Sequence, residues 1–313
     1  MVYCIGETVL DIIFQEGRPI AAKPGGSMLN SAISLGRSGV PVHFISDFAK
    51  DQPGDLIWDF LLQNQVGTDY IDRIDGGKTA LALAFLDKHH DADYSFYKMF
   101  PKKRLNISFP VIEKGDIILF GSYYALTGDL RKRLISFIRN ARSKGAYILY
   151  DPNFRKSHLA ELEKVKPWII ENVSLSSMVR GSDEDFRHIF GVNDENSAFI
   201  HLSEAGCQLL VYTKNKENVE VVSKKFHRSF KVKPINPLST IGAGDAFNAG
   251  IIYAASNLFT KTGNSVKLWE VDPKKWPWDD IIDIAIGFAS NVCQSLDNYI
   301  SIDYAGYLKT NNH

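Results

Sequence analysis

The sequence is poor in cysteine, carries no net charge and has no long hydrophobic run, and each shortage excludes a class of protein. Its three cysteines, Cys4, Cys207 and Cys293, are an odd number without CxxC spacing. This pattern argues against a disulfide framework or a zinc site and favours reduced, buried thiols. The 36 basic residues balance 36 acidic ones, so no net field attracts nucleic acid or an anionic membrane. Any phosphate site must therefore be local.

Hydrophobic residues are plentiful, but they never form a segment long enough to span a bilayer. The first residues, Met1–Gly6, lack the basic and apolar regions of an export signal. We therefore expect a soluble, cytoplasmic protein without a membrane partner. With 45% hydrophobic residues among 313, the chain can bury a substantial core, as one large domain or as a large domain with a small appendage.

Short apolar runs alternate with amphipathic segments along the chain, and each run lies near a Gly, Asp or Asn that can end a strand. The runs span Val2–Ile5, Val42–Ile45, Ile117–Phe120, Tyr147–Tyr150, Ser177–Val179 and Gln208–Tyr212. Between several of them, helical spacing such as that of residues 130–141 places apolar side chains on one face. Strands that alternate with helices predict a mainly parallel sheet covered by helices on both sides.

Two stretches, near residues 12–23 and 79–100, have a different hydrophobic pattern. Apolar and small residues alternate in them, as in residues 80–85, which read Ala-Leu-Ala-Leu-Ala-Phe. This alternation predicts antiparallel strands in a small accessory sheet. Such a sheet is either an ordinary hairpin excursion or a lid over a functional site, and the pattern alone does not separate the two.

A glycine-rich turn at residues 239–250 opens into a helical pattern and is the most informative segment. Gly242 and Gly244 permit close approach of a ligand, and the amide hydrogens at a helix start favour an anion. Asp245 lies in the same turn, where it is either a functional carboxylate or an ordinary helix cap. Because no Gly-Lys-Ser/Thr follows, the segment is not an ordinary P-loop.

Several segments match family signatures in the right order. Residues 239–245 resemble a C-terminal DTxGAGD signature, and Gly25-Gly26 with Asn30 resembles an N-terminal one. Residues 6–11 and 151–155 resemble two further conserved segments. On these residues the chain resembles the ribokinase-like (PfkB) carbohydrate kinases over nearly its whole length. The resemblance implies a single domain over residues 1–313, a three-layer α/β/α fold with a mostly parallel central sheet, and a small β lid.

The same resemblance implies roles for the C-terminal signature. Gly242, Ala243 and Gly244 form an anion hole for the phosphoryl group transferred from ATP, and Asp245 takes the proton from the acceptor hydroxyl. Both roles suit phosphoryl transfer, which depends on in-line positioning and on donors aimed at developing negative charge.

The resemblance also assigns binding residues on both sides of the site. On the substrate side it implies Asp11, Gly25, Gly26, Asn30, Asn153 and Arg155. On the nucleotide side it implies Thr213, Asn215, Gly242, Gly244 and Asn291. Two assignments have structural alternatives: Arg155 either reaches the substrate or ties down its own loop, and Asn291 lies either beside the adenine or on a mostly buried helix.

Two departures from the family pattern affect the ions. Ser239 and Ile241 replace residues that are common in a loop of the monovalent-cation site, so potassium dependence is an open question. Glu184 and Asp185 stand where relatives carry an Asn-x-x-Glu motif that organises magnesium through water. Carboxylate oxygens suit a hard, hydrated cation, so Mg²⁺ is still expected.

Within the family, the opening Gly6-Glu7 to Asp11 and the lid segment resemble fructokinases. A 2-keto-3-deoxygluconate kinase is the nearest rival interpretation, because it shares the general sequence pattern. Its specificity rests on lid and pocket residues, which the motifs do not place. An alternative of a different class is a catalytically silent sugar- or nucleotide-binding regulator, suggested by the altered Ser239. The lid sheet is also a candidate homodimer interface.

Overall fold

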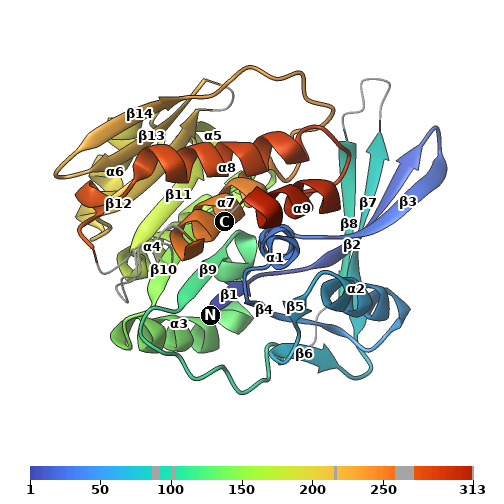
Figure 1. The fold of residues 1–313 in the computed structure, drawn as a ribbon. Coiled ribbons are helices and arrows are strands. Elements are labelled where there is room, and N and C mark those ends of the chain that lie inside the picture. Colours follow the sequence, from blue (N-terminus) through green and yellow to red (C-terminus); the bar gives the residue numbers. More distant parts are fainter. Residues whose placement is uncertain (87–91, 100–102, 215–216, 258–270, 312–313) are drawn as a thin grey trace.

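The computed structural model describes residues 1–86, 92–99, 103–214, 217–257 and 271–311. A ten-stranded central sheet runs through the middle of the protein, in the order β14-β13-β12-β11-β10-β9-β1-β4-β5, with β6 paired to β4 (Figure 1). Its strands are β1 (Val2–Ile5), β4 (Val42–Ala49), β5 (Val66–Gly67), β6 (Ile71–Ile74), β9 (Ile117–Gly121), β10 (Tyr147–Asp151), β11 (Met178–Ser182), β12 (Leu209–Lys214), β13 (Asn218–Ser223) and β14 (His227–Lys231).

Most neighbouring strands of this sheet are parallel. β1 pairs in parallel with β4 and β9, and the parallel pairing continues through β10 and β11 to β12. All six strands expected from the apolar runs are present. The hairpin β13-β14 adds two antiparallel strands at one edge. β14 was not predicted, since its residues are exposed or half-buried and form no apolar run.

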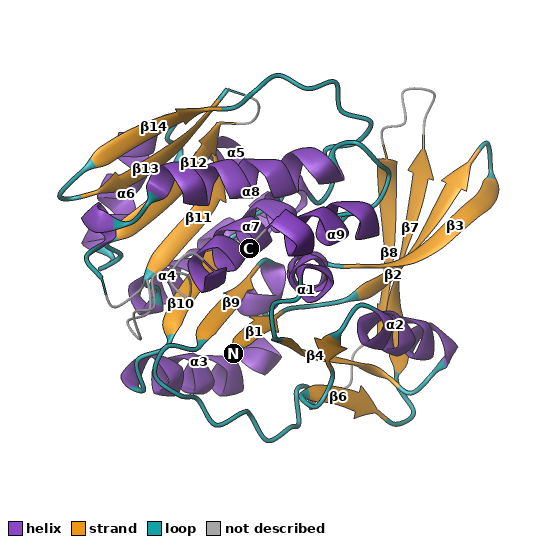
Figure 2. Ribbon diagram, viewed as in Figure 1, coloured by secondary structure: helices purple, strands orange, loops and turns teal. Residues whose placement is uncertain are grey.

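Helices cover both faces of the sheet, as Figure 2 shows. They are α1 (Ser27–Ser38), α2 (Gln52–Gln63), α3 (Gly128–Ser143), α4 (Leu162–Leu175), α5 (Asp183–Phe190), α6 (Glu195–Glu204), α7 (Ala243–Asn257), α8 (Trp278–Val292) and α9 (Ile302–Asn311). One buried cluster joins the sheet to α1, α7 and α8, and a second joins it to α3, α4, α5 and α6. This confirms the expected three-layer α/β/α architecture with a mostly parallel sheet.

A separate four-stranded sheet projects at the right of Figure 1. Its order is β3-β2-β7-β8, from the strands β2 (Val9–Gln15), β3 (Arg18–Gly25), β7 (Lys78–Leu86) and β8 (Ala92–Met99). The two irregular stretches of the sequence therefore come together in one sheet. The predicted antiparallel pairing is confirmed for β2 with β3 and for β7 with β8. It was wrong for β2 with β7, which pair in parallel. A parallel pair needs a long connection, and α1, β4 and α2 are among the elements that provide it.

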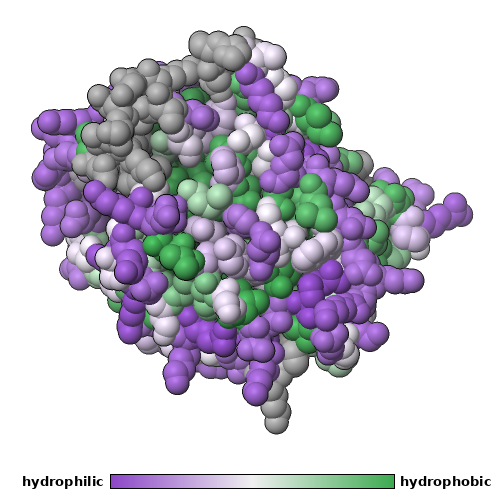
Figure 3. Space-filling model, turned by 60° about the horizontal axis from the view of Figure 1, so that its bottom comes forward, coloured by the Kyte–Doolittle hydropathy of each residue, from purple (hydrophilic) through white to green (hydrophobic). Residues whose placement is uncertain are grey.

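The surface is mixed in character. On the face shown in Figure 3, hydrophobic side chains form separate groups among hydrophilic ones. None of the helices in the described ranges is long and apolar enough to cross a membrane. Cys4, Cys207 and Cys293 are buried free thiols, as predicted.

Candidate active site

The first turn of α7 is shaped by glycine. Gly242 precedes the helix with φ of +82°, a left-handed conformation that few side chains tolerate. A Cβ at this position would also lie 2.4 Å from the carbonyl oxygen of Asn298. The backbone therefore approaches Asn298 closely, turns, and starts α7 at Ala243. The first amide hydrogens of a helix have no partner within the helix, so this turn presents donors to an anion.

The N-terminus of α1 lies against this turn and holds Asp245. Ser27 Oγ donates to Asp245 Oδ1 at 2.5 Å, and Asn30 Nδ2 donates to Oδ2 at 2.8 Å. Ser31 Oγ donates to the Asp245 carbonyl at 2.8 Å. The two signature segments are thus joined directly. Because both carboxylate oxygens accept bonds from another helix, Asp245 is more than a cap of its own helix. Sequence reasoning had missed Ser27 and Ser31, which are small polar residues on the first turns of a buried helix.

Burial determines the protonation of Asp245. The residue is 7% exposed, and this desolvation raises the pKa of its carboxyl. The bonds from Ser27 and Asn30 and the charges of Arg155 and Arg180 oppose the rise. The carboxylate therefore binds a proton more readily than an exposed aspartate while keeping partners that stabilise its ionised form. This combination is typical of a general base.

Asp11 extends from β2 beside the glycine pair. It is buried, and burial raises its pKa to about 6 against the opposing charge of Lys23. A Cβ on Gly25 would lie 2.0 Å from Asp11 Oδ2, so only glycine leaves room for this carboxylate. Gly26 has φ of +128°, and a Cβ there would lie 2.3 Å from the carbonyl oxygen of Glu7. Both glycines are therefore required where the small sheet meets α1.

The end of β10 adds a third buried carboxylate, Asp151. Asp151 Oδ2 accepts from Asn248 Nδ2 at 2.6 Å. Burial raises the pKa of Asp151 to about 6, while the charge of Arg180 opposes the rise. The backbone of Asn153 adopts φ of +39° and donates to Asp151 Oδ1 at 3.0 Å. Arg155 is exposed, and its charge reaches Asp245, so the loop after β10 lies beside the first turn of α7.

Three of the residues expected on the nucleotide side lie outside the first turn of α7. Thr213 is buried at the end of β12, where its Oγ1 accepts from Arg180 Nη2 at 2.9 Å. Asn215 lies outside the described residues. Asn291, on α8, accepts at Oδ1 from the backbone N–H of Ser301 at 2.8 Å. This bond matches the structural alternative for Asn291, since it fixes the start of α9.

The residues expected near magnesium are arranged at the start of α5. Asp185 is buried and forms a capping box with Ser182, while its Oδ1 accepts from the Phe154 amide at 2.6 Å. Glu184 is exposed, with Oε1 3.9 Å from His188 Nε2. Its carboxylate suits a hydrated cation better than that of Asp185, because Asp185 is already used by the protein.

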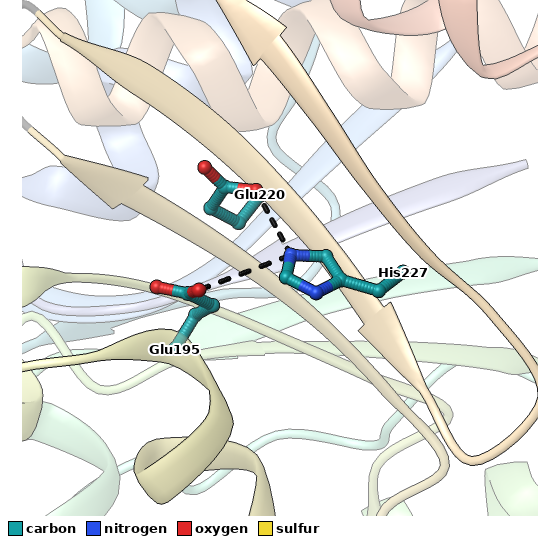
Figure 4. Close-up of side chains that lie close together, drawn as sticks. All are labelled: Glu195, Glu220 and His227. Carbon is teal, nitrogen blue, oxygen red and sulfur yellow. Dashed lines mark hydrogen bonds and ion pairs between the residues drawn. The ribbon is translucent and has the colours of Figure 1, made fainter.

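A third group of ligand-type side chains lies at the edge of the sheet (Figure 4). His227 Nε2 is 3.0 Å from Glu220 Oε2 and 3.9 Å from Glu195 Oε1. Lys214 Nζ lies 2.8 Å from Glu195 Oε2, and Ser229 Oγ donates to Glu220 Oε1 at 2.8 Å. Both carboxylates therefore already have partners: Glu195 pairs with the Lys214 ammonium, and Glu220 accepts from the Ser229 hydroxyl. We therefore interpret the cluster as a polar link between α6, β13 and β14, and not as a metal centre.

Anion donors at a helix start, a buried carboxylate beside them and polar side chains at the ends of parallel strands define the site of a phosphotransferase. Residues 1–303 match the pfkB family of carbohydrate kinases, and the chain belongs to this family. It is an ATP-dependent sugar kinase of the fructokinase-like type.

Curated relatives and a solved structure agree with this membership. The chain is 27% identical to a fructokinase of Rhizobium leguminosarum bv. trifolii, over 83% of this chain and 82% of that protein. It is 25% identical to fructokinase-2 of Solanum habrochaites, over 84% and 82% of the two chains. The fructokinase of Vibrio cholerae O395, solved with fructose, ADP and calcium, superposes with a TM-score of 0.82 at 19% identity and covers 98% of both chains.

Proposed function

We propose that this protein transfers the terminal phosphoryl group of ATP to a hydroxyl of fructose. The observation that carries the proposal is the direct contact of Asp245 with Asn30, which joins the carboxylate of one signature to the polar helix start of the other. The curated fructokinase relatives support fructose as the acceptor.

The site residues divide the chemistry in a simple way. Asp245 accepts the proton of the sugar hydroxyl, and that oxygen then attacks the phosphorus in line with the departing ADP. Backbone donors at Gly242 and Gly244 stabilise the charge on the phosphoryl oxygens. The amide of Ala243, which donates to the Thr240 carbonyl at 3.3 Å, joins them when the phosphoryl group is bound. The attacking hydroxyl takes the place of Ser27 at Asp245 Oδ1, while Asn30 continues to hold Oδ2.

Polar side chains around Asp245 bind the sugar in this proposal. Buried Asn30 Oδ1 has no hydrogen-bond partner among the described residues, so it is available to accept from a sugar hydroxyl. Asp11 lies against Gly25, and we propose that its carboxylate and the backbone of Gly25 and Gly26 contact the sugar. Asn153 and Arg155 approach from the loop after β10.

The nucleotide binds on the other side of the first turn of α7. Gly242, Gly244 and Thr213 contact its phosphates, and we propose that Asn215 contributes from the following turn. We propose that Asn291 lies only at the edge of the adenine region, because its side-chain oxygen already accepts a hydrogen bond from the Ser301 amide. Mg²⁺ bound with ATP would supply charge neutralisation; the exposed carboxylate of Glu184 would hold it through water, and Asp185 would fix the helix start.

The small sheet is proposed to join two copies of the chain. Phe14 and Phe85 stack on its neighbouring strands with ring centroids 4.9 Å apart, and Phe85 is 41% exposed. Cross-strand neighbours point to one side of a sheet, so Ile12 and Leu83 extend the same apolar row. Ile12, Phe14 and Leu83 are half-buried and Phe85 is exposed, and an apolar row that is only partly covered favours a partner surface. The buried free thiols favour a reducing compartment, and we place the protein in the cytoplasm.

A coupled ADP-release assay tests the proposed reaction. Purified protein with ATP and Mg²⁺ is measured across fructose, ribose, 2-keto-3-deoxygluconate, tagatose and adenosine, with and without K⁺. We expect ADP release to depend on the sugar and to have its highest kcat/KM with fructose. Nucleotide binding without turnover on any acceptor would favour the silent-regulator alternative, and preference for 2-keto-3-deoxygluconate would correct the substrate.

A further inference from the structure

The guanidinium of Arg180 lies buried among three neighbouring strand ends and α7. Arg180 is 7% exposed on β11. Its Nη1 lies 3.1 Å from Asp151 Oδ2 on β10, and its Nη2 donates to Thr213 Oγ1 on β12 at 2.9 Å. The guanidinium also lies over the ring of Phe247, 5.5 Å from the centroid. One side chain thus connects β10, β12 and α7.

The same guanidinium lies against the glycine of the anion-binding turn. A Cβ placed on Gly244 would lie 2.8 Å from Arg180 Nη1 and 3.2 Å from Nη2. Glycine at this position is therefore what allows the cation to approach the first turn of α7. The positive charge and the helix amides consequently converge on one small region beside Asp245.

A purely structural role for Arg180 would be to neutralise Asp151. That role accounts for Nη1, and the bond to Thr213 accounts for Nη2, but neither accounts for Nε. Nε of Arg180 is buried and has no hydrogen-bond partner among the described residues. Leaving a buried donor unpaired is costly, and more so for a charged group. A planar guanidinium with a spare donor beside an anion-binding turn is suited to a phosphate oxygen.

We propose that Arg180 contacts the terminal phosphoryl group of ATP and is a catalytic residue; this inference rests on the proposed kinase function. As the bond between the terminal phosphorus and the bridging oxygen breaks, a bond from the sugar oxygen to phosphorus forms. The hydroxyl proton passes to Asp245, and the bridging oxygen leaves with ADP. Arg180 and the amides of α7 stabilise the oxygens of the transferring group, while Asp151 and Thr213 keep the guanidinium in place.

Binding affinities for two nucleotides separate this role from a structural one. Calorimetry with Mg²⁺ compares ADP with the non-hydrolysable analogue AMP-PNP for wild type, Arg180→Lys and Arg180→Gln. For Arg180→Gln we expect AMP-PNP to bind 10- to 100-fold more weakly, ADP to change less than threefold, and kcat to fall about 10³-fold, in the range seen when arginines are removed from phosphoryl-transfer sites. Arg180→Lys should recover part of the loss, because it keeps the charge.

Arg131 provides a matched control. It is another buried arginine, whose Nη1 donates to the Ala125 carbonyl at 2.7 Å and to Asn172 Oδ1 at 3.1 Å, between α3 and α4. Arg131→Gln should lower the melting temperature without separating AMP-PNP from ADP. Equal weakening of both nucleotides by Arg180→Lys, in a folded protein, would overturn the proposal. A wild-type protein that binds both nucleotides but phosphorylates no sugar would instead contradict the proposed function and leave the binding comparison valid.

Discussion

At the residue scale, the site combines buried carboxylates with partners that keep them ionisable. Desolvation raises the pKa of Asp245, Asp11 and Asp151. Each of them also has a cation that opposes this rise: Arg180 for Asp245 and Asp151, and Lys23 for Asp11. Desolvation makes the ionised carboxylates less stable, and the neighbouring cations offset part of this effect, a balance often found at catalytic sites.

The first prediction concerns the base. Asp245→Asn removes the proton acceptor and little volume, and an amide oxygen can still accept from Ser27 or Asn30. We expect kcat to fall by about 10²- to 10⁴-fold, with KM for both substrates changed little. Steady-state ADP release measures this, and the melting temperature checks the fold. Turnover close to wild type would show that another group takes the proton.

The second prediction concerns Asp11 and pH. Its pKa is about 6 in the folded protein against 3.8 for an ordinary aspartate, so between about pH 4 and 6 the folded state holds more protons than the unfolded state. Stability from this group is therefore lost as pH rises through that window. Asp11→Asn abolishes the loss and should raise the free energy of unfolding at pH 7, by up to about 3 kcal/mol.

Thermal unfolding of wild type and Asp11→Asn at several pH values measures the effect. The variant should gain stability relative to wild type from pH 4 to pH 6.5 and no further above it. Taking the difference cancels the contribution of Asp151, which both proteins share. A difference that does not depend on pH would mean that the Asp11 carboxyl titrates normally. The same variant should bind fructose more weakly.

At the scale of elements, buried polar bonds anchor the chain where it returns from the small sheet. Arg104 follows β8 and donates through Nε to Asp47 Oδ2 at 2.6 Å and through Nη2 to Oδ1 at 3.0 Å. Tyr124 also donates to Asp47 Oδ1 at 2.8 Å. Asp47 lies near the end of β4, and its side chain is fully buried. The small sheet is thus fastened to the large one by a bidentate ion pair.

Removing one charge of this pair gives the third prediction. Asp47→Asn removes one charge of this buried bidentate pair, which typically costs about 3–5 kcal/mol. Urea unfolding should show this loss, and fructose affinity should fall as the small sheet loses its anchor. The control is Asp75→Asn, which breaks the exposed pair with Lys50 and should cost about 1 kcal/mol or less. Equal losses in the two variants would contradict the anchoring role.

Many of the strands could be predicted from the sequence. Apolar runs located the central strands because parallel strands buried on both faces leave a continuous hydrophobic signal. The contacts of Ser27 with Asp245 and of Arg180 with Gly244 could not be predicted, because they join segments far apart in the chain. The parallel pairing of β2 with β7 escaped for the same reason, since alternation indicates a strand but not its neighbour.

At the scale of the whole molecule, the small sheet carries the apolar row of Ile12, Phe14, Leu83 and Phe85, which belongs to neither of the two large buried clusters. If two copies pair through it, Phe85→Asp should leave the protein monomeric at micromolar concentration, because a charge would be buried at the interface. Sedimentation velocity measures this. Val111→Asp, at a position 89% exposed outside the sheet, is the matched control and should leave the mass unchanged. A wild-type protein that sediments only as a monomer would contradict the dimer.

The bonds from α1 to Asp245 also have a consequence for how the protein is made. Ser27 and Asn30 precede Asp245 by 218 and 215 residues. All described strands of the small sheet and of the central sheet precede Asp245, so the ribosome adds them before the residue proposed to take the proton. A product that terminates before α7 lacks Asp245 and therefore has no general base. Only the full-length chain is therefore expected to be active. Two fragments cut between β14 and α7 should be inert apart and regain activity when mixed.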